Sequence, residues 1–443
     1  MAVKVDLPRK LALEVLLRFE KSGAERLKAD SLIQDALARG QANLTEQDRG
    51  FVYALCMGTL RHWLRLDEWI KLLTGRPLKN ITPPVRVMLR LGLFQLYGLS
   101  HVPAYAAINT TVELAKAQKQ APKTVKFINA VLREAQRRLE AGGFEIPPVE
   151  ADLPRYLLLT SGWPEVWTRQ LLERYTQQEI LQMAEVSQVP VSLSIRVNTL
   201  KIQPDAYLAL LKQAAIEATQ ASDLPESILI SGLSGSPRQL PGYEEGLFYV
   251  QDSSSMWVSH LLAPQPGESV LDLCAAPGSK TTHMAALMQN QGAISAIEPK
   301  KDRLALLTEN IDRLGVGNVT CLQADGLTFE PPVTLYDKVL VDAPCSGSGT
   351  LRRHPEILLH LKKLNLDAYR KQQLSLLQKG FACLKPGGAM VYSTCSILKA
   401  ENHDVVAQLL ATCPDAALEK EEQRLINENA DGFYAARILK MPV

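Results

Sequence analysis

No apolar run in the sequence reaches the roughly 18 to 20 residues that a membrane-spanning helix needs. The N-terminal segment has an acid at Asp6 and no apolar core, so it does not resemble a secretory signal. The seven cysteines are odd in number and scattered, with no Cys-x-x-Cys pair and no cluster with histidine. This pattern predicts neither a disulfide framework nor a metal site. We therefore expect a cytoplasmic, reduced protein that has no membrane partner and binds no metal.

Internal repeats and low-complexity segments are also missing, and 46% hydrophobic with 22% charged residues is an ordinary globular composition. A length of 443 residues predicts two or three domains. The net charge of +2 hides an asymmetry, because residues 1–145 carry a net +9 and the remainder a net −7. A basic module joined to an acidic one predicts that the first part meets a polyanion, with incidental surface charge as the alternative.

Residues 1–142 have the pattern of an all-α domain. Thr45 followed by Asp48 is typical of a capped helix start. Glycine and proline pairs between positions 142 and 148 mark the end of this part. Apolar periodicity and proline positions predict helices over 10–19, 83–96 and 122–139.

The rest of the chain divides into a mixed region over 150–245 and an α/β domain over 246–443. In the mixed region we expect a helix over 163–182 and a strand over 191–198. Beyond it, short apolar strands alternate with helices, which predicts a doubly wound parallel sheet covered on both faces. The expected strands are 269–273, 293–297, 319–322, 338–341 and 389–392, and the expected helices are 280–288, 301–314 and 367–383.

A turn of small residues follows the first of these strands, in Val270-Leu-Asp-Leu-Cys-Ala-Ala-Pro-Gly-Ser-Lys280. Small side chains let a ligand approach the backbone, and the helix that begins there directs N–H groups toward it. The turn is neither Gly-x-Gly-x-x-Gly nor a P-loop, so a dinucleotide or ATP is not favoured. Three acids at successive strand ends are expected beside the same ligand: Glu298 for ribose hydroxyls, Asp325 for an adenine edge, and Asp342.

Two cysteines stand at the ends of neighbouring strands, Cys345 in Asp342-Ala-Pro-Cys and Cys395 in Ser393-Thr-Cys. We expect both thiols to border one cleft. A thiol with an ordinary pKa of about 8.5 is little ionised at pH 7, so a nucleophilic cysteine needs neighbouring groups that favour its thiolate form. A helix expected over 399–410 would favour the Cys395 thiolate through its N-terminal dipole. Four other cysteines are expected to be packing residues: Cys56, Cys321, Cys383 and Cys413.

Five segments resemble motifs of RNA cytosine-5 methyltransferases. They are Leu271-Asp-Leu-Cys-Ala-Ala-Pro-Gly-Ser-Lys280, Asp342-Ala-Pro-Cys-Ser-Gly-Ser-Gly-Thr350, Ser393-Thr-Cys-Ser396, Ser194-Ile-Arg-Val-Asn-Thr199 and Val250-Gln-Asp-Ser-Ser-Ser255. The helical first part is similar to the NusB-like module of the Sun/Fmu (RsmB-type) bacterial branch, which acts on small-subunit ribosomal RNA. The likeness covers nearly the whole chain and is most specific over 246–400. Ser279 departs from the pattern, since many members have a second glycine there.

The resemblance implies a Rossmann-like, S-adenosylmethionine-dependent methyltransferase that acts, as a monomer, on carbon 5 of a cytosine in 16S ribosomal RNA. It implies that Cys395 attacks carbon 6 of the base and that Cys345 serves the later release of the RNA. DNA cytosine methyltransferases use the Pro-Cys cysteine as nucleophile and lack the Thr-Cys-Ser one, so the presence of both favours RNA. The cofactor residues that it implies are Cys274, Ala275, Ala276, Pro277, Gly278, Ser279, Lys280, Glu298, Asp325 and Asp342.

Other interpretations stay open at this point. Lys280 is expected to orient the base or its phosphate, or else to be solvated. Arg352-Arg353-His354 is expected to contact a phosphate or a base, with a solvated charge cluster as the alternative. Transfer RNA is an alternative substrate. Two other classes of function are also open: a non-catalytic RNA-binding factor of ribosome assembly, and a methyltransferase that acts on proteins or small molecules.

Overall fold

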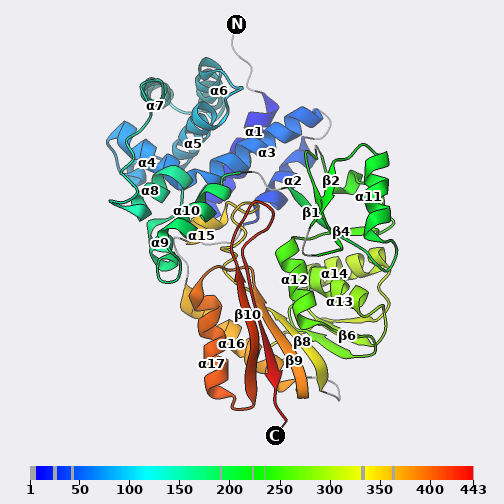
Figure 1. Ribbon diagram of the computed structural model, residues 1–443. Coiled ribbons are helices and arrows are strands. Elements are labelled where there is room, and N and C mark those ends of the chain that lie inside the picture. Colours follow the sequence, from blue (N-terminus) through cyan, green and yellow to red (C-terminus); the bar gives the residue numbers. More distant parts are fainter. Residues whose placement is uncertain are drawn as a thin grey trace. The chain divides into compact units, whose positions relative to one another are not determined.

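The computed structural model describes residues 6–22, 27–40, 44–189, 192–221, 224–233, 235–330, 335–361 and 365–442. The chain forms two compact units (Figure 1). The first comprises Met1–Gln188 and Arg353–Leu364, and the second comprises Val189–Arg352 and Asn365–Val443. No described helix is both long and apolar enough to cross a membrane.

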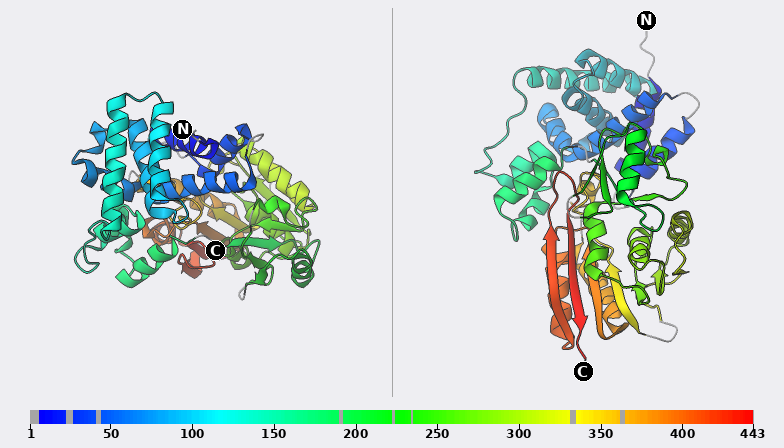
Figure 2. Two further views of the ribbon diagram at one scale, coloured as in Figure 1. Left: turned by 90° about the horizontal axis from the view of Figure 1, so that it is seen from above. Right: turned by 45° about the vertical axis from the view of Figure 1, so that its right-hand side comes forward.

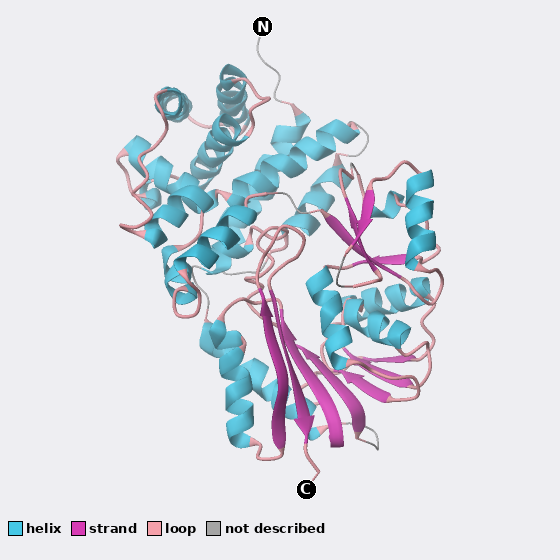
Figure 3. Ribbon diagram, in the orientation of Figure 1, coloured by secondary structure: helices cyan, strands magenta, loops and turns pink. Residues whose placement is uncertain are grey.

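Helices make up the described elements of the first unit, as the sequence predicts for its N-terminal part (Figure 3). The predicted capped start is confirmed, because the Thr45 side chain accepts a hydrogen bond from the Asp48 N–H and Asp48 reciprocates. The apolar face of α1 packs against α3 and α5 around a core that includes Leu16, Leu55 and Leu89. The helices are α1 (Leu7–Ser22), α2 (Ala29–Arg39), α3 (Glu46–Arg61), α4 (Trp63–Thr74), η2 (Leu78–Asn80), α5 (Pro83–Gly98), α6 (Ala104–Ala117), α7 (Pro122–Glu140), α8 (Leu153–Ser161), α9 (Glu165–Leu171), α10 (Gln177–Val186) and α15 (Ile357–Leu361).

The single helix expected over 163–182 is wrong, because the structure has α9 and α10 there. Thr176 forms a second capping box with Glu179. This capping box starts α10 as a separate helix, where the sequence had suggested a single continuous helix. The late segment Arg353–Leu364 returns to the first unit: the Ala29 N–H donates to Glu356 Oε1 at 3.2 Å, and Leu359 packs against the helical core.

The second unit begins with a small antiparallel sheet in the order β2-β3-β1-β4. β1 covers most of the predicted strand, whose residue Val191 lies outside the described residues. Ile195, Tyr207 and Phe248 are fully buried between this sheet and its helix α11. The elements are β1 (Leu193–Val197), α11 (Pro204–Gln213), β2 (Ala218–Gln220), β3 (Ser227–Ile230), η3 (Pro237–Gln239) and β4 (Phe248–Val250).

A seven-stranded sheet forms the centre of the second unit, in the order β10-β11-β9-β8-β5-β6-β7. The predicted parallel strands are confirmed from β9 to β7. β10 and β11 add an antiparallel pair at one edge that the sequence did not reveal (Figure 2). The strands are β5 (Ser269–Asp272), β6 (Ala293–Ile297), β7 (Val319–Leu322), β8 (Tyr336–Asp342), β9 (Leu384–Thr394), β10 (Ala416–Arg424) and β11 (Phe433–Lys440).

Helices cover both faces of this sheet, as the apolar strands require. Val270 faces a core with α12 (Ser253–Leu262), α13 (Ser279–Leu287) and α14 (Lys301–Leu314). Its neighbour Leu271 faces the opposite core, built with α16 (Leu366–Ala382) and α17 (His403–Thr412). This alternation along β5 is that of a strand buried on both sides, so the sheet's functional groups are confined to its edges and strand ends.

Candidate active site

The predicted turn of small residues connects β5 to α13. β5 ends at Asp272 and α13 begins at Ser279, so the intervening backbone leads directly into a helix N-terminus. Gly278 has a φ of 103°, and a Cβ there would lie 2.7 Å from Leu307 Cδ1. The positive φ therefore favours glycine, and a side chain there would also have to displace the Leu307 methyl group. The turn fixes the positions of the N–H groups at the start of α13, and N–H groups at a helix start can donate to a ligand.

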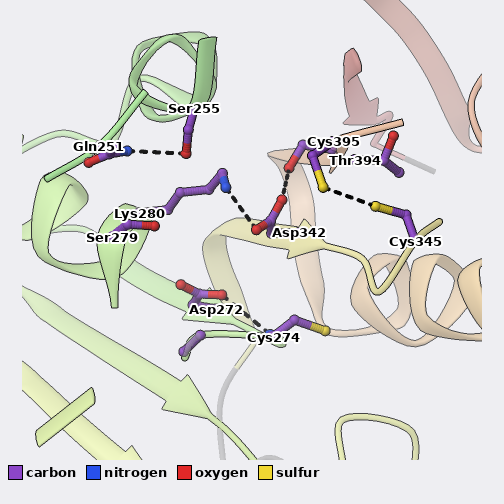
Figure 4. Close-up of polar contacts among 12 residues, drawn as sticks. Gln251, Ser255, Asp272, Cys274, Ser279, Lys280, Asp342, Cys345, Thr394 and Cys395 are labelled. Carbon is purple, nitrogen blue, oxygen red and sulfur yellow. Dashed lines mark hydrogen bonds and ion pairs between the residues drawn. The ribbon is translucent and has the colours of Figure 1, made fainter. Parts of the chain in front are cut away.

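Asp272 anchors the base of this turn (Figure 4). Its buried carboxylate accepts hydrogen bonds from the Thr281 hydroxyl at 2.7 Å and from the Cys274 N–H at 3.3 Å. Burial raises the pKa of Asp272 to about 6, against the effect of these hydrogen bonds. Burial also raises the pKa of the Cys274 thiol well above its ordinary value, which leaves Cys274 protonated and unsuited to act as a nucleophile.

Arg196 supports the same turn from the small sheet, a role that the sequence did not reveal. Its fully buried guanidinium donates to the Ser279 carbonyl and to Gln251, and its Nη2 lies 2.8 Å from Thr282 Oγ1. Burial lowers the pKa of Arg196 to about 10, so the side chain stays charged at neutral pH. In the sequence, only the resemblance of the segment around Arg196 to the methyltransferase family pointed to this residue. That resemblance did not indicate which residues Arg196 contacts.

Of the three acids expected beside a ligand, Glu298 follows β6, Asp325 follows β7 and Asp342 is the last residue of β8, so all three lie at the carboxyl ends of parallel strands. Glu298 is buried, accepts from the Lys300 N–H at 2.9 Å and lies 3.2 Å from Arg303 Nη1. Asp325 is exposed, and its carboxylate caps its own loop by accepting from the Leu327 N–H at 2.9 Å. Their positions agree with the rule that doubly wound sheets bind ligands beyond their strand carboxyl ends.

Lys280 and Asp342 form an ion pair at the centre of this edge (Figure 4). Lys280 Nζ lies 2.7 Å from Asp342 Oδ2, and the Ser393 hydroxyl donates to Asp342 Oδ1 at 2.8 Å. Lys280 is almost fully buried, with its Nζ 4.9 Å from the Phe433 ring centroid. The solvated alternative for Lys280 is therefore wrong, because the ammonium group is paired and enclosed.

The two cysteines meet, as the strand order predicts. Cys345 Sγ and Cys395 Sγ are 3.3 Å apart at the ends of β8 and β9, with Cys345 buried and Cys395 partly exposed (Figure 4). The Cys395 thiol and burial together raise the pKa of Cys345 well above its ordinary value. A thiol held protonated is a poor nucleophile, so the geometry favours Cys395 for attack.

The helix dipole expected to activate Cys395 is not there. A short 3₁₀ turn, η4 (Lys399–Glu401), follows the cysteine, and α17 begins only at His403. The field of a helix terminus acts over about one turn, so α17 starts too far along the chain to assist. The structure instead ties the Cys395 carbonyl to the Gly349 N–H at 2.9 Å, which links the two cysteine loops.

The prediction that Arg352 contacts a phosphate or a base is wrong. Its guanidinium is buried and donates to the carbonyls of Val189, Asn427 and Glu428. Arg353 and His354 belong to the first unit, where His354 Nδ1 lies 3.6 Å from Glu356 Oε1. The three residues that the sequence grouped together thus lie in two units, and the expected contact stays a prediction for Arg353 and His354.

One cluster of metal-ligating residue types occurs among the described residues, at Glu226, His260 and His283. Glu226 Oε1 lies 2.6 Å from His260 Nε2 and 2.9 Å from His283 Nε2. Ligands of one tetrahedral zinc ion stand about 3.3 Å apart, given metal–ligand distances of about 2.0 Å. Glu226 and His260 are hydrogen-bonded, and both distances are shorter than those between two ligands of one zinc ion. Burial alone would raise the pKa of Glu226, but the two histidines lower it below its ordinary value.

Comparison with known proteins first gives the class. The family model described as 16S rRNA methyltransferase RsmB/F matches residues 259–439, which contain the turn, the three acids and both cysteines. The NusB family matches residues 6–137, and the ferredoxin-like domain of RsmF/B-like methyltransferases matches residues 163–233. The chain is a methyltransferase that carries a NusB-like domain and a ferredoxin-like domain ahead of its Rossmann-like sheet.

The relatives then give the family. A Klebsiella pneumoniae protein named ribosomal RNA small subunit methyltransferase B is 35% identical over 414 residues, which cover 90% of this chain and 92% of that protein. The chain therefore belongs to the RsmB/F family. A crystal structure of a methyltransferase homolog from Pyrococcus horikoshii is 31% identical, with a TM-score of 0.56 over 64% of this chain and 98% of that chain. The crystal structure of PH0851, at 24% identity, shares the fold over 99% of this chain and all of that one, with a TM-score of 0.80.

Proposed function

We propose that this protein transfers a methyl group from S-adenosylmethionine to carbon 5 of a cytosine in small-subunit ribosomal RNA, through a covalent bond between Cys395 and the base. The observation that carries the proposal is the pair of thiols 3.3 Å apart beside the Lys280–Asp342 ion pair. The substrate is free RNA or an assembly intermediate, and the enzyme acts as a cytoplasmic monomer.

The residues around the turn suit this cofactor. Gly278 keeps the backbone free of a side chain, and the start of α13 offers N–H donors. In this proposal the buried carboxylate of Glu298 accepts from the ribose hydroxyls, and Asp325, beyond β7, faces the adenine edge. When bound, the cofactor supplies an electrophilic methyl group.

The chemistry follows from the poor nucleophilicity of cytosine carbon 5. The Cys395 thiolate forms a bond to carbon 6, and the electron pair displaced onto carbon 5 forms the new bond to the methyl carbon. The bond from that carbon to the sulfonium sulfur breaks, its electron pair stays on sulfur, and S-adenosylhomocysteine leaves. Ring nitrogen 3 takes up a proton from solvent as carbon 6 is attacked and returns it on release, so the charge that develops there during methyl transfer is positive. The Asp342 carboxylate, held by Lys280 and Ser393, stabilises that charge. A base then takes the proton from carbon 5, the carbon 6–sulfur bond breaks and the thiolate leaves, in the step assigned to Cys345.

The direct test combines methyl transfer with mapping of the product. Purified protein, labelled S-adenosylmethionine and small-subunit ribosomal RNA should give labelled RNA that is lost on RNase treatment, with a new 5-methylcytosine by bisulfite sequencing. Transfer RNA incubated in parallel should stay unlabelled. Label that resists RNase would contradict the RNA substrate, and label in transfer RNA alone would contradict the ribosomal one.

Glu298 should govern cofactor affinity. We expect Glu298→Ala to weaken S-adenosylmethionine binding by about 1–3 kcal/mol, because charge-assisted hydrogen bonds to the ribose are lost. Isothermal titration calorimetry measures this directly. Glu309→Ala, which removes an exposed carboxylate from the following helix α14, is the matched control and should bind the cofactor normally. Equal binding by Glu298→Ala and wild type would remove Glu298 from the site.

The NusB-like domain should supply affinity for the RNA backbone. Lys123, Lys126, Arg133 and Arg137 are exposed and recur along one face of α7 at helical spacing. Neutralising Lys123, Lys126 and Arg133 together should lower the slope of log affinity against log salt by about 2 for single-stranded RNA. Fluorescence anisotropy across a salt series measures the slope. Lys212→Ala, on α11, should leave the slope unchanged; an unchanged slope in the triple variant would exclude this face.

A further inference from the structure

The residue that connects the two cysteine loops is Glu401, the last residue of η4. Its side chain is fully buried. Oε1 accepts from the Ser346 N–H at 2.8 Å and from Gln373 Nε2 at 3.1 Å, while Oε2 accepts from the hydroxyls of Ser346 at 2.5 Å and Ser396 at 2.6 Å. All four donors are neutral. Burying a charge is costly unless it is both hydrogen-bonded and paired with an opposite charge. These four partners supply hydrogen bonds but no positive charge, so packing alone does not account for the arrangement.

The partners of Glu401 matter because of their place in the chain. Ser346 follows Cys345 directly, and Ser396 follows Cys395 directly. One carboxylate therefore binds the residue that follows each cysteine. The two residues lie on the loops that follow the neighbouring strands β8 and β9. A shift of the carboxylate moves both loops and changes the 3.3 Å separation of the two sulfur atoms.

Additional hydrogen bonds fix Glu401 itself and close the network. The Tyr392 hydroxyl donates to the Glu401 carbonyl at 2.6 Å. The hydroxyls of Ser346 and Ser348 lie 3.3 Å and 3.0 Å from the Ser396 hydroxyl. Buried hydrogen-bond networks make a structure rigid and favour one geometry, and each carboxylate oxygen of Glu401 accepts two hydrogen bonds in this one.

We propose that Glu401 is a positioning residue that sets the separation and orientation of Cys345 and Cys395. This inference rests on the proposed function, because it matters for catalysis only if both thiols act on one base. Reacting groups lose large factors in rate when they move by about 1 Å, so losing this carboxylate should impair both the attack and the release.

The geometry can be measured without RNA. Diamide oxidises two adjacent thiols to a disulfide: each sulfur gives up a proton and an electron, the S–S bond forms, and the N=N bond of diamide is reduced to a hydrazine. Peptide mapping by mass spectrometry then gives the rate of the Cys345–Cys395 cross-link in the full-length protein. Methyl transfer under single-turnover conditions, and the dissociation constant of S-adenosylmethionine, are measured on the same samples.

We expect Glu401→Ala to slow both the cross-link and methyl transfer by about tenfold or more, with cofactor affinity within about twofold of wild type. Glu401→Gln should recover most of both rates, because serine hydroxyls can rotate to accept from the amide where they donated to the carboxylate. Glu356→Ala, which removes another buried glutamate in the first unit, is the matched control and should react like wild type.

A Glu401→Ala protein that folds, cross-links and methylates at wild-type rates would overturn the inference. If circular dichroism shows that it does not fold, Ser346→Ala/Ser396→Ala removes only the two hydroxyl donors and should slow the same two rates; wild-type rates there would also overturn it. A wild-type protein that cross-links rapidly but methylates no RNA would instead refute the proposed function, while the cross-link still tests the positioning.

Discussion

Cys345→Ser is expected to accumulate a covalent protein–RNA complex that survives denaturing electrophoresis. In this variant Cys395 still attacks carbon 6 and the methyl group is still transferred, but the step assigned to Cys345 fails. The carbon 6–sulfur bond therefore persists. The structure makes the two roles separable, because the sulfur atoms are adjacent but only Cys345 is buried.

Cys395→Ser should give neither methylated RNA nor complex, because an unactivated hydroxyl cannot replace a thiolate. The double variant should also give no complex, since the bond is never made. Cys383→Ser, at a buried cysteine of the core, is the matched control and should release methylated RNA normally. A complex in the Cys395→Ser protein would contradict this assignment. It would make Cys345 the nucleophile, as the Pro-Cys cysteine is in DNA cytosine methyltransferases.

The second large effect is expected at Asp342. Asp342→Ala should lower the single-turnover rate by about 100- to 1,000-fold, the loss typical of removing a group that stabilises transition-state charge. It leaves Lys280 buried without its partner, so some loss of stability accompanies it. Asp342→Asn keeps the acceptor for Ser393 and should be the more stable variant of the two. Quenched-flow methyl transfer at saturating RNA and cofactor measures the rate.

Asp337 provides a control on the same strand. It lies near the other end of β8, where its carboxylate accepts from Ser269 and pairs with Lys385. Asp337→Asn should lower stability and leave the single-turnover rate within a few-fold of wild type. If Asp342→Ala and Glu298→Ala show the same kinetic profile, with weaker cofactor binding and normal turnover, the separate role of Asp342 is contradicted.

Local signals predicted the parts of the fold and site that depend on neighbouring residues. The helix over 301–314 was predicted to the residue, because its periodic pattern ends at Gly315, which takes the positive φ of a helix C-terminus. The turn before α13 and the two cysteine loops were found because each lies at a strand end with unusual small or polar residues. The juxtaposition of Cys345 and Cys395 followed from the expected strand order.

Contacts between distant residues were not predictable in this way. Arg196 reaches Ser279 and Thr282, and no local pattern indicates such a partner. Arg352 carried a charge that suggested phosphate, yet its partners are carbonyls brought together only by folding. The β10–β11 pair was missed because Glu419, Lys420, Glu421 and Glu422 interrupt the apolar alternation of an edge strand.

The return of residues 353–364 to the first unit has a consequence for the order of events during synthesis. The helical unit is assembled from an N-terminal part and from a segment that emerges only after β8 has been made. Glu356 and Leu359 cannot contact α2 and the helical core until then. Domains usually fold in the order in which they leave the ribosome, but here neither unit is one continuous stretch of chain. Completion of the first unit therefore waits for part of the second, so a nascent chain cannot hold a finished first unit before the Cys345 loop has been synthesised.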